Sequence, residues 1–204
     1  MTGPSVAVLD YGIGNLRSAQ KALVEVGADA RLTSDPKEID AADGIVLPGV
    51  GAFGACMEAL EQREMVSVAV DAAGSGRPFL GICVGMQLLY QSSQESPGVS
   101  GLGIMPGMVK WLPEGVKHPQ MQWNRLSVNQ PDHPLMTGLD QSWLYFVHSL
   151  SVVPTDPSQI LATTDYGGPI VAATTYRNIV ATQFHPEKSA SVGLRLLSNF
   201  VGLL

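Results

Sequence analysis

The stretch "PFLGICVGMQLLY", residues 78–90, joins a predicted strand to a predicted helix through a single cysteine. Residues 78–82 form a short apolar run, which is typical of a strand buried on both faces of a parallel sheet. Cys83 follows, with Gly81 and Gly85 two places away on either side. G-x-C-x-G at a strand-to-helix turn is the cysteine form of the nucleophile elbow, whose sharp turn exposes the side chain. The dipole of the following helix favours the thiolate. We therefore predict that Cys83 is a nucleophile.

A buried, unreactive core residue is the usual fate of a free cysteine. We assign that role to Cys56, which lies in the helical pattern "GACMEAL". For Cys83, the elbow makes the core interpretation the weaker of the two.

The first half of the chain predicts parallel β-α-β units, because short β-branched runs alternate with helical patterns. The predicted strands cover residues 5–9, 29–32, 44–48 and 78–82. One helix is expected from an Asn15 N-cap to Gly27, and a short one over residues 35–40 with Pro36 in its first turn. A third passes through Cys56 and Leu60 and extends to Val70.

The second half has many Pro, Gly and Asn breaks, which predict shorter, partly antiparallel strands around Val109, Leu126, Leu144 and Val152. Residues 172–184 predict a hairpin with its turn at 177–178. Ser189 is the expected cap of a last helix that ends at Val201. These elements indicate an α/β protein: a flavodoxin-like three-layer α/β/α fold with a mostly parallel central sheet and an antiparallel extension. We expect one domain over residues 1–204.

Composition excludes several classes of function. The chain has 204 residues, 45% of them hydrophobic, and a net charge of -6 with scattered basic residues, so a nucleic acid is not expected as a partner. No stretch has the roughly 18 apolar residues of a membrane span and the N-terminus has no signal pattern, so a cytoplasmic protein is expected. The two cysteines have no metal spacing; we expect them to be reduced, and expect no metal or other cofactor.

A nucleophilic thiol needs a base, and the segment "TQFHPEKS" offers His185 where a predicted strand ends. Pro186 favours extended geometry at His185, so that His185 and Glu187 can project to the same side. Glu187 could then orient one imidazole nitrogen while the other faces the thiol. Taken alone, His-Pro-Glu would more often be an ordinary loop; its pairing with the elbow makes it a candidate site.

Acyl transfer also needs donors for an oxyanion. The segment "LPGVGAF", residues 47–53, follows a strand expected near the Cys83 strand, and its glycines let the backbone turn an N–H inward. The predicted donors are the N–H groups of Val50, Gly51 and Val84. A phosphate loop is the alternative, but a Walker lysine is absent. His148, in "YFVHSL", is either a core-edge residue or part of the pocket wall.

These motifs together resemble the class I (triad) glutamine amidotransferases, in which a cysteine and a His-x-Glu pair hydrolyse the amide of glutamine. Within that family, nearly the whole chain is similar to the glutaminase subunits of imidazole glycerol phosphate synthases, of histidine biosynthesis. The segments that carry this similarity are "DYGIGNLRS", "LPGVGAFG", "LGICVGMQLL", "GLGIMPG", "FVHS" and "ATQFHPEKS". The chain departs from the family pattern at Gln120, Gln122 and Leu150.

The resemblance implies a role for each matching residue. Cys83 attacks the carboxamide, His185 carries the proton to ammonia and Glu187 orients His185. The implied substrate-binding residues are Gly51, Gln87, His148, Ser149 and Leu150. The implied partner is a (β/α)8-barrel cyclase that forms a heterodimer with this chain and uses the ammonia to make imidazole glycerol phosphate and an aminoimidazole carboxamide ribotide. The residues expected at that interface are Asn15, Arg17, Trp123, Asn124 and Lys188.

Three other functions stay open from the sequence. The chain could be the glutaminase of another synthase, such as anthranilate or carbamoyl phosphate synthesis. It could be a stand-alone cysteine hydrolase or peptidase, which would act without a partner. It could also be a non-catalytic binding module in which Cys83 only packs.

Overall fold

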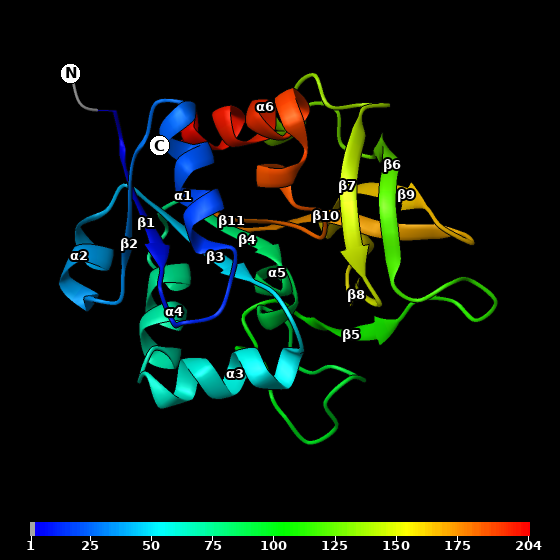
Figure 1. Cartoon of the computed structure of the whole chain (residues 1–204), viewed down its shortest axis with the longest axis horizontal. Helices are drawn as coiled ribbons and strands as arrows, with labels where there is room; N and C mark the ends of the chain where they lie inside the picture. Colours follow the sequence, from blue (N-terminus) through cyan, green and yellow to red (C-terminus); the bar gives the residue numbers. More distant parts are fainter. Residues whose placement is uncertain (1–2) are drawn as a thin grey trace.

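A nine-stranded mixed sheet organises the chain, as seen in a computed structural model that describes residues 3–204 (Figure 1). The strand order is β2-β1-β3-β4-β11-β10-β9-β6-β7, and β5 and β8 form a separate pair. The strands are β1 Ser5–Leu9, β2 Asp29–Thr33, β3 Gly44–Gly49, β4 Phe79–Cys83, β5 Gly107–Trp111, β6 Gln120–Val128, β7 Trp143–His148, β8 Leu150–Pro154, β9 Ile160–Asp165, β10 Pro169–Tyr176 and β11 Ile179–Thr182.

The sheet is parallel in its first half, and β11 joins it parallel to β4. Every residue of β3 and β4 is buried, as the continuous apolar runs predict for strands covered on both faces. Helices α1 (Leu16–Glu25) and α6 (Ala190–Val201) lie side by side over one face of the sheet. Helices α3 (Phe53–Gln62), α4 (Val66–Gly74) and α5 (Val84–Leu88) lie on the other face (Figure 1). The three-layer prediction is confirmed for this half.

The antiparallel extension is also confirmed, with strands at all four predicted positions of the second half. The hairpin of β10 and β11 turns at residues 177–178, where Arg177 has a φ of 55°. Strand β9 was not among the predicted strands. It pairs with both β10 and β6 and so connects the hairpin to the sheet edge.

The prediction of a single helix that reaches Val70 is wrong. The chain forms α3 (Phe53–Gln62) and α4 (Val66–Gly74), separated by a bend at Glu64, whose φ is 57°. Left-handed backbone cannot continue an α-helix, so the chain changes direction there. Continuous apolar periodicity across the bend concealed this break.

Helices α1 and α6 begin at the expected residues, but the predicted side-chain caps of both helices are wrong. Neither Asn15 nor Ser189 makes a side-chain capping bond. The Asn15 amide instead donates to Glu187 Oε1 at 3.2 Å. Ser189 Oγ donates to the His185 carbonyl at 2.6 Å and accepts from the Tyr145 N–H at 3.0 Å. Both side chains therefore hold the segment that follows β11.

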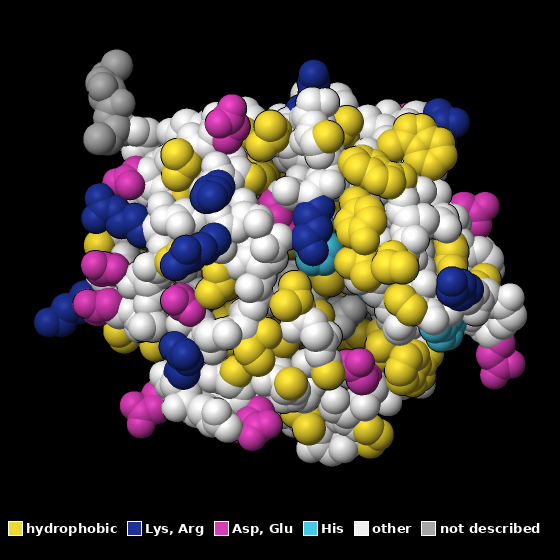
Figure 2. Space-filling model, viewed as in Figure 1, with side chains coloured by type: hydrophobic (Ala, Val, Ile, Leu, Met, Phe, Trp, Pro, Cys, Tyr) yellow, Lys and Arg dark blue, Asp and Glu magenta, His cyan; other side chains and the backbone are white. Residues whose placement is uncertain are grey.

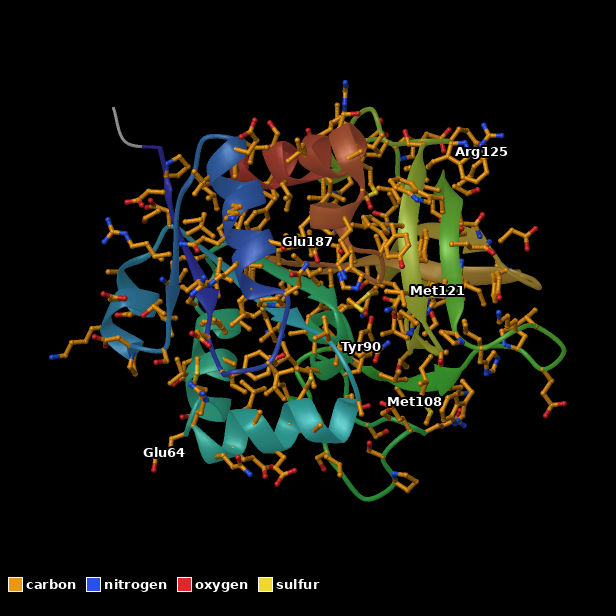
Figure 3. All side chains as sticks on the ribbon, viewed as in Figure 1. Glu64, Tyr90, Met108, Met121, Arg125 and Glu187 are labelled. Atoms are coloured by element: carbon orange, nitrogen blue, oxygen red, sulfur yellow. The ribbon has the colours of Figure 1, made fainter. Side chains whose placement is uncertain are left out.

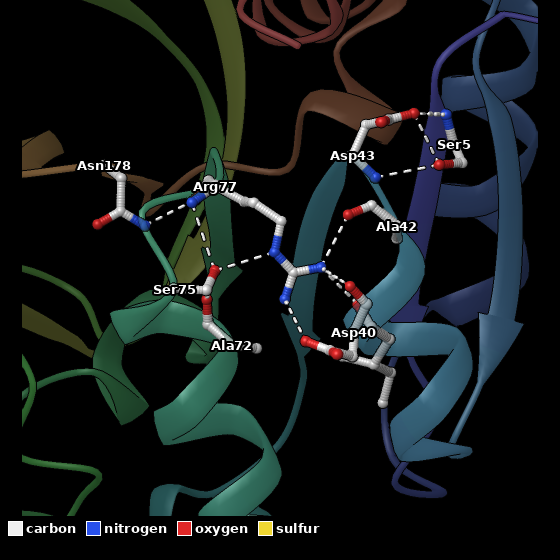
Figure 4. A network of polar contacts seen from close by, with 9 residues as sticks. Ser5, Asp40, Ala42, Asp43, Ala72, Ser75, Arg77 and Asn178 are labelled. Atoms are coloured by element: carbon white, nitrogen blue, oxygen red, sulfur yellow. Dashed lines mark hydrogen bonds and ion pairs between the residues drawn. The ribbon is translucent and has the colours of Figure 1, made fainter.

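Arg77 holds the segment that precedes β4, at the end of the strand opposite Cys83. Its Nη1 donates to the carbonyls of Ile39, Asp40 and Ala42 at the end of α2 (Pro36–Ala41), each at 2.8 Å (Figure 4). The last carbonyls of a helix lack partners within the helix, so Arg77 supplies a donor to all three, of which the Ile39 carbonyl also accepts from the Ala42 N–H at 3.4 Å. Asn178 Nδ2 donates to the Arg77 carbonyl at 2.6 Å, so the hairpin turn, α2 and the start of β4 are held together.

Candidate active site

The ends of β3 and β4 lie side by side, with Gly49 opposite Cys83 in the parallel register. Cys83 adopts φ 56° and ψ -113°, a conformation sparsely populated by side chains other than glycine. Helix α5 (Val84–Leu88) begins at the next residue. A Cβ at Gly85 would lie 1.9 Å from the Leu47 carbonyl oxygen, so only glycine lets the two backbones approach this closely. The structure thus contains the sharp elbow expected from G-x-C-x-G.

Strand β11 lies on the other side of β4 and delivers His185 to the same sheet edge. His185 Nδ1 is 2.8 Å from Glu187 Oε1, and both side chains are only 2% exposed. Glu187 sits in a short 3-10 turn, Pro186–Lys188, near the centre of the molecule (Figure 3). The other ring nitrogen is left for Cys83, which lines the same pocket as His185, and Gln183 Nε2 donates to the Cys83 sulfur at 3.8 Å.

The electrostatics of the pair favour an imidazolium next to a carboxylate. Burial alone would lower the pKa of His185, but the hydrogen bonds and charges of Cys83 and Glu187 outweigh it and raise that pKa to about 9. Burial alone would raise the pKa of Glu187, whereas the hydrogen bond and the charge of His185 lower it below its ordinary value. The two shifts agree: the carboxylate stabilises the protonated ring.

A pocket of ≈ 310 Å³ opens above this cysteine and contains most of the predicted site. It is lined by Val50, Gly51, Cys83, Val84, Gln87, Glu95, Pro119, Val147, His148, Ser149, Leu150, His185 and Lys188. The structure thus brings the three catalytic candidates, the three oxyanion candidates and the five substrate-binding candidates together, except that Glu187 lies behind His185. Lys188, expected at the interface, is at the same pocket.

Two buried polar side chains of the pocket wall are fixed by the carbonyl of Leu150. Gln87 Nε2 donates to it at 3.2 Å and to Gln183 Oε1 at 3.0 Å. His148 Nδ1 lies 2.8 Å from it and must carry the proton, because a carbonyl can only accept. Burial lowers the pKa of His148 to about 4, so this ring is neutral. Of the two interpretations of His148, the pocket wall is the one that the structure supports.

Glu95 is a pocket residue that was not predicted from the sequence. Its Oε2 accepts a hydrogen bond from the Phe53 N–H at 2.7 Å, and Ser96 Oγ accepts from the Gly54 N–H at 3.1 Å. Both bonds satisfy the N-terminus of α3, whose N-cap residue, Ala52, has no side-chain acceptor. That missing acceptor was the available signal, but the sequence does not say which distant loop supplies it.

The residues expected at a partner interface fall into two groups. The amides of Asn15 and Asn124 have partners within the chain, Glu187 Oε1 and, at 2.8 Å, the Asp165 carbonyl. Arg17, Trp123 and Lys188 are exposed.

Trp123 belongs to the apolar outer face of the β6–β7 hairpin, which the register builds from Met121, Trp123, Tyr145, Val147 and Trp143. Met121, Trp123 and Trp143 are 62%, 45% and 54% exposed. Hydrophobic side chains gather over these two strands in Figure 2, and Figure 3 shows Met121 and Arg125 on β6. Because Val147 also lines the pocket, this outer face reaches the pocket mouth.

Neither a metal site nor a membrane span is found within residues 3–204. No group of three or more His, Cys, Asp or Glu side chains in that range could hold a metal ion. None of its helices is long and apolar enough to cross a membrane.

Comparison with known proteins identifies the family. The family model "Glutamine amidotransferase class-I" matches residues 7–203. The proteins named "Imidazole glycerol phosphate synthase subunit HisH" from Synechococcus elongatus and Methanothermobacter thermautotrophicus are each 48% identical to this chain, over 202 and 201 residues. The alignments cover 97% and 98% of this chain, and 93% and 98% of those proteins.

Solved structures show the same fold at much lower sequence identity. PurLQS from Thermotoga maritima superposes with a TM-score of 0.78 at 19% identity, covering 98% of each chain. A crystal structure described as a glutamine amidotransferase gives a TM-score of 0.77 at 20% identity, covering 97% of each chain. The family-model match and the 48% identity to the HisH proteins show that this chain, with its cysteine elbow and buried His-x-Glu pair, belongs to the class I glutamine amidotransferases and, within them, to the HisH family.

Proposed function

We propose that this chain hydrolyses glutamine to glutamate and ammonia at Cys83 and delivers the ammonia to a cyclase partner. The observation that carries the proposal is the buried His185–Glu187 pair, 2.8 Å apart, beside a thiol on a strained elbow. That arrangement has a nucleophile, a proton carrier and an orienting acid in one pocket. The HisH relatives are named as subunits of imidazole glycerol phosphate synthase, which supports this assignment within histidine biosynthesis.

The first half of the reaction forms a thioester. Cys83 gives its proton to His185, and the sulfur bonds to the carboxamide carbon of glutamine. His185, as imidazolium, returns the proton to the amide nitrogen, so that the C–N bond breaks and ammonia leaves. Glu187 stabilises the imidazolium through Nδ1 and keeps the other nitrogen toward the sulfur. Water then attacks the thioester with His185 as base, which releases glutamate and restores the thiol.

The pocket supplies groups for each part of glutamine. Val50, Gly51 and Val84 line the pocket, and their backbone N–H groups are the donors we propose for the oxyanion that forms from the carbonyl oxygen. One carboxylate oxygen of Glu95 accepts from the Phe53 N–H, and the other can accept from the α-ammonium group of glutamine. Gln87, His148, Ser149 and Leu150 complete the wall that would hold the substrate.

A partner is expected to cover the mouth of this pocket. Ammonia becomes protonated and diffuses away in water, so its consumer must dock against the site. The apolar outer face of the β6–β7 hairpin reaches the mouth and exposes two tryptophans, the kind of aromatic anchor that interfaces favour. A barrel cyclase is the partner we propose for this face, with Lys188 at the pocket and Arg17 exposed on α1.

The test is a glutaminase assay with purified chain, alone and with a barrel cyclase and its nucleotide ligand. We expect little turnover alone, a large increase in the liganded complex, and loss of the activity in Cys83→Ala. Rapid hydrolysis of peptides without a partner would instead favour a stand-alone cysteine hydrolase. Stimulation by a different synthase only would reject the histidine pathway. An unchanged rate in Cys83→Ala would reject Cys83 catalysis.

A further inference from the structure

Gln183 is a fully buried side chain with no part in the proposed reaction, yet it contacts the reacting sulfur. It follows β11 directly, and its backbone N–H donates to the Ala172 carbonyl at 2.8 Å. The side-chain Nε2 donates to the Cys83 sulfur at 3.8 Å, and Oε1 accepts from Gln87 Nε2 at 3.0 Å. The Gln183 amide therefore bridges the sulfur and the pocket wall.

We infer that the Gln183 amide is a further catalytic residue, which stabilises the Cys83 thiolate once the thiol proton has passed to His185. For its role in turnover the inference rests on the proposed glutaminase function. A buried anion is costly unless it is hydrogen-bonded, and Cys83 is only 3% exposed. An amide N–H donates to the thiolate and keeps its own proton, so it favours the charged sulfur over the neutral thiol.

The neighbours of the Gln183 amide determine which of its ends faces the sulfur. The Leu150 carbonyl can only accept, so the end of Gln87 that lies 3.2 Å from it must be the NH2 group. The same NH2 group meets Gln183 at 3.0 Å, and the end of Gln183 that it meets must be the carbonyl oxygen. The NH2 group of Gln183 is left for Cys83. Gln87 and the Leu150 carbonyl are therefore positioning groups for this donor.

The three contacts form one chain of hydrogen bonds, from the Leu150 carbonyl through Gln87 and Gln183 to Cys83. Hydrogen bonds in series polarise one another in a dry interior, which strengthens the last donor of the chain. Gln183 and His185 are two residues apart in the segment that follows β11. One segment thus supplies both the proton acceptor and the amide donor for the sulfur.

The ionisable groups around Cys83 stay the same when Gln183 is replaced by an uncharged side chain. They are His185 and Lys188 after β11, His148 at the end of β7, Glu95 in the loop after α5, Tyr11 after β1 and Cys56 on α3. A different pH dependence of Cys83 in such a variant therefore reports the lost amide and not a changed charge.

The test is alkylation of the full-length chain by iodoacetamide at a series of pH values, followed on the Cys83 peptide by mass spectrometry. Gln183→Met keeps a side chain of similar size without a donor, and Gln183→Glu keeps the shape but replaces the NH2 group by oxygen. The midpoint of the alkylation curve should lie about one pH unit higher in Gln183→Met, a tenfold change in the ratio of thiolate to thiol. In Gln183→Glu it should rise at least as far, because a carboxylate opposes the thiolate.

The matched control is Thr174→Val in the neighbouring strand β10. Thr174 is fully buried and accepts from the Tyr90 hydroxyl at 3.4 Å, so the variant also loses one buried hydrogen bond, but away from the pocket. Its alkylation midpoint should equal that of the wild type.

The rates separate loss of the donor from a loosened pocket. Thiolate reactivity rises with basicity with a coefficient of about 0.4–0.5, so Gln183→Met should be alkylated about threefold faster above both midpoints and about threefold slower below them. A loosened pocket would change the rate in one direction at every pH. In the complex with the partner, the acid limb of kcat/KM for glutamine should move to higher pH by the same amount.

Equal midpoints in the wild type and in both Gln183 variants would overturn the inference, as would a uniform change of rate at every pH. If Gln183→Met does not fold, Gln183→Glu gives the same decision. An inactive wild-type complex would instead overturn the proposed function, and the alkylation midpoints would still decide whether the amide stabilises the thiolate.

Discussion

Replacing Glu187 by Gln removes one charge from the centre of the site while changing almost no volume. Glu187 Oε1 accepts from His185 Nδ1 at 2.8 Å and from the Asn15 amide at 3.2 Å, with the carboxylate 2% exposed. Water therefore does not screen the interaction. A hydrogen bond to a charged group contributes about 1.5–3 kcal/mol. Since about 1.36 kcal/mol is tenfold in rate, the variant should lose about 10- to 150-fold in kcat.

The same substitution should move the pH profile, and the sign is fixed by the charge. The pKa of His185 is raised to about 9 partly by Glu187, so the imidazolium persists below that pH and is lost as the pH rises through it. Without the carboxylate the proton is lost at lower pH. We therefore expect the alkaline limb of kcat, near pH 9 in the wild-type complex, to shift toward neutral pH in Glu187→Gln. His148 should not contribute to this limb, because its pKa is lowered to about 4 by burial.

The assay is ammonia release at saturating glutamine and partner across neutral and alkaline pH, with the matched variant Asn15→Ala as control. Asn15→Ala removes the second donor to Oε1 but keeps the charge, so kcat should fall only about 2- to 12-fold with the alkaline limb in place. Near wild-type kcat and an unshifted limb in Glu187→Gln would refute the proposed role of the carboxylate.

Three further predictions separate binding, stability and local packing. Glu95→Gln keeps an acceptor for the Phe53 N–H but loses the charge; KM for glutamine should rise about tenfold with kcat nearly unchanged, and an unchanged KM would exclude Glu95 from substrate binding. Arg77→Met removes a charged donor from three carbonyls at the end of α2, of which only that of Ile39 keeps another donor in the described chain, the Ala42 N–H. Urea unfolding should therefore show a loss of about 1–3 kcal/mol at unchanged kcat, whereas Arg31→Met, in an exposed ion pair, should leave stability nearly unchanged. Equal losses in both variants would contradict this. Gly85→Ala forces a Cβ to 1.9 Å from a backbone oxygen and should lower Tm by about 5–10 °C. Gly74→Ala, with open space around it, should leave Tm unchanged or slightly higher. Similar Tm values for the two variants would be evidence against close packing at the elbow.

Much of the fold could be predicted because its signals are local. Apolar runs set β1, β3 and β4, and glycine spacing around Cys83 set the elbow. The break between α3 and α4 was missed because it depends on one residue's backbone conformation at Glu64, which apolar periodicity does not record. The capping roles predicted for Asn15 and Ser189 were wrong because each side chain has another partner. Asn15 bonds to Glu187, which is distant in the sequence, and Ser189 bonds to the His185 carbonyl in the preceding turn.

Site residues that belong to a short sequence motif could be predicted, whereas those that reach the site only through tertiary contacts could not. The elbow and His-x-Glu are short patterns, and the structure brings both to one pocket. Glu95 lies in a loop with no motif, and its bond to the N-terminus of α3 is a contact between segments distant in the sequence. Cys56 was interpreted as inert core; it is buried as expected, but its bond to the Val50 carbonyl is visible only in the structure.

In the proposed mechanism, covalent attack of the Cys83 sulfur breaks the amide bond of glutamine. The direct measurement is peptide mass spectrometry of the complex after acid quench during turnover with isotopically labelled glutamine. We expect a labelled glutamyl group on the Cys83 peptide, absent from Cys83→Ser and from the Cys56 peptide. Steady turnover with the label on Cys56, or undiminished glutamine hydrolysis by Cys83→Ser, would contradict it.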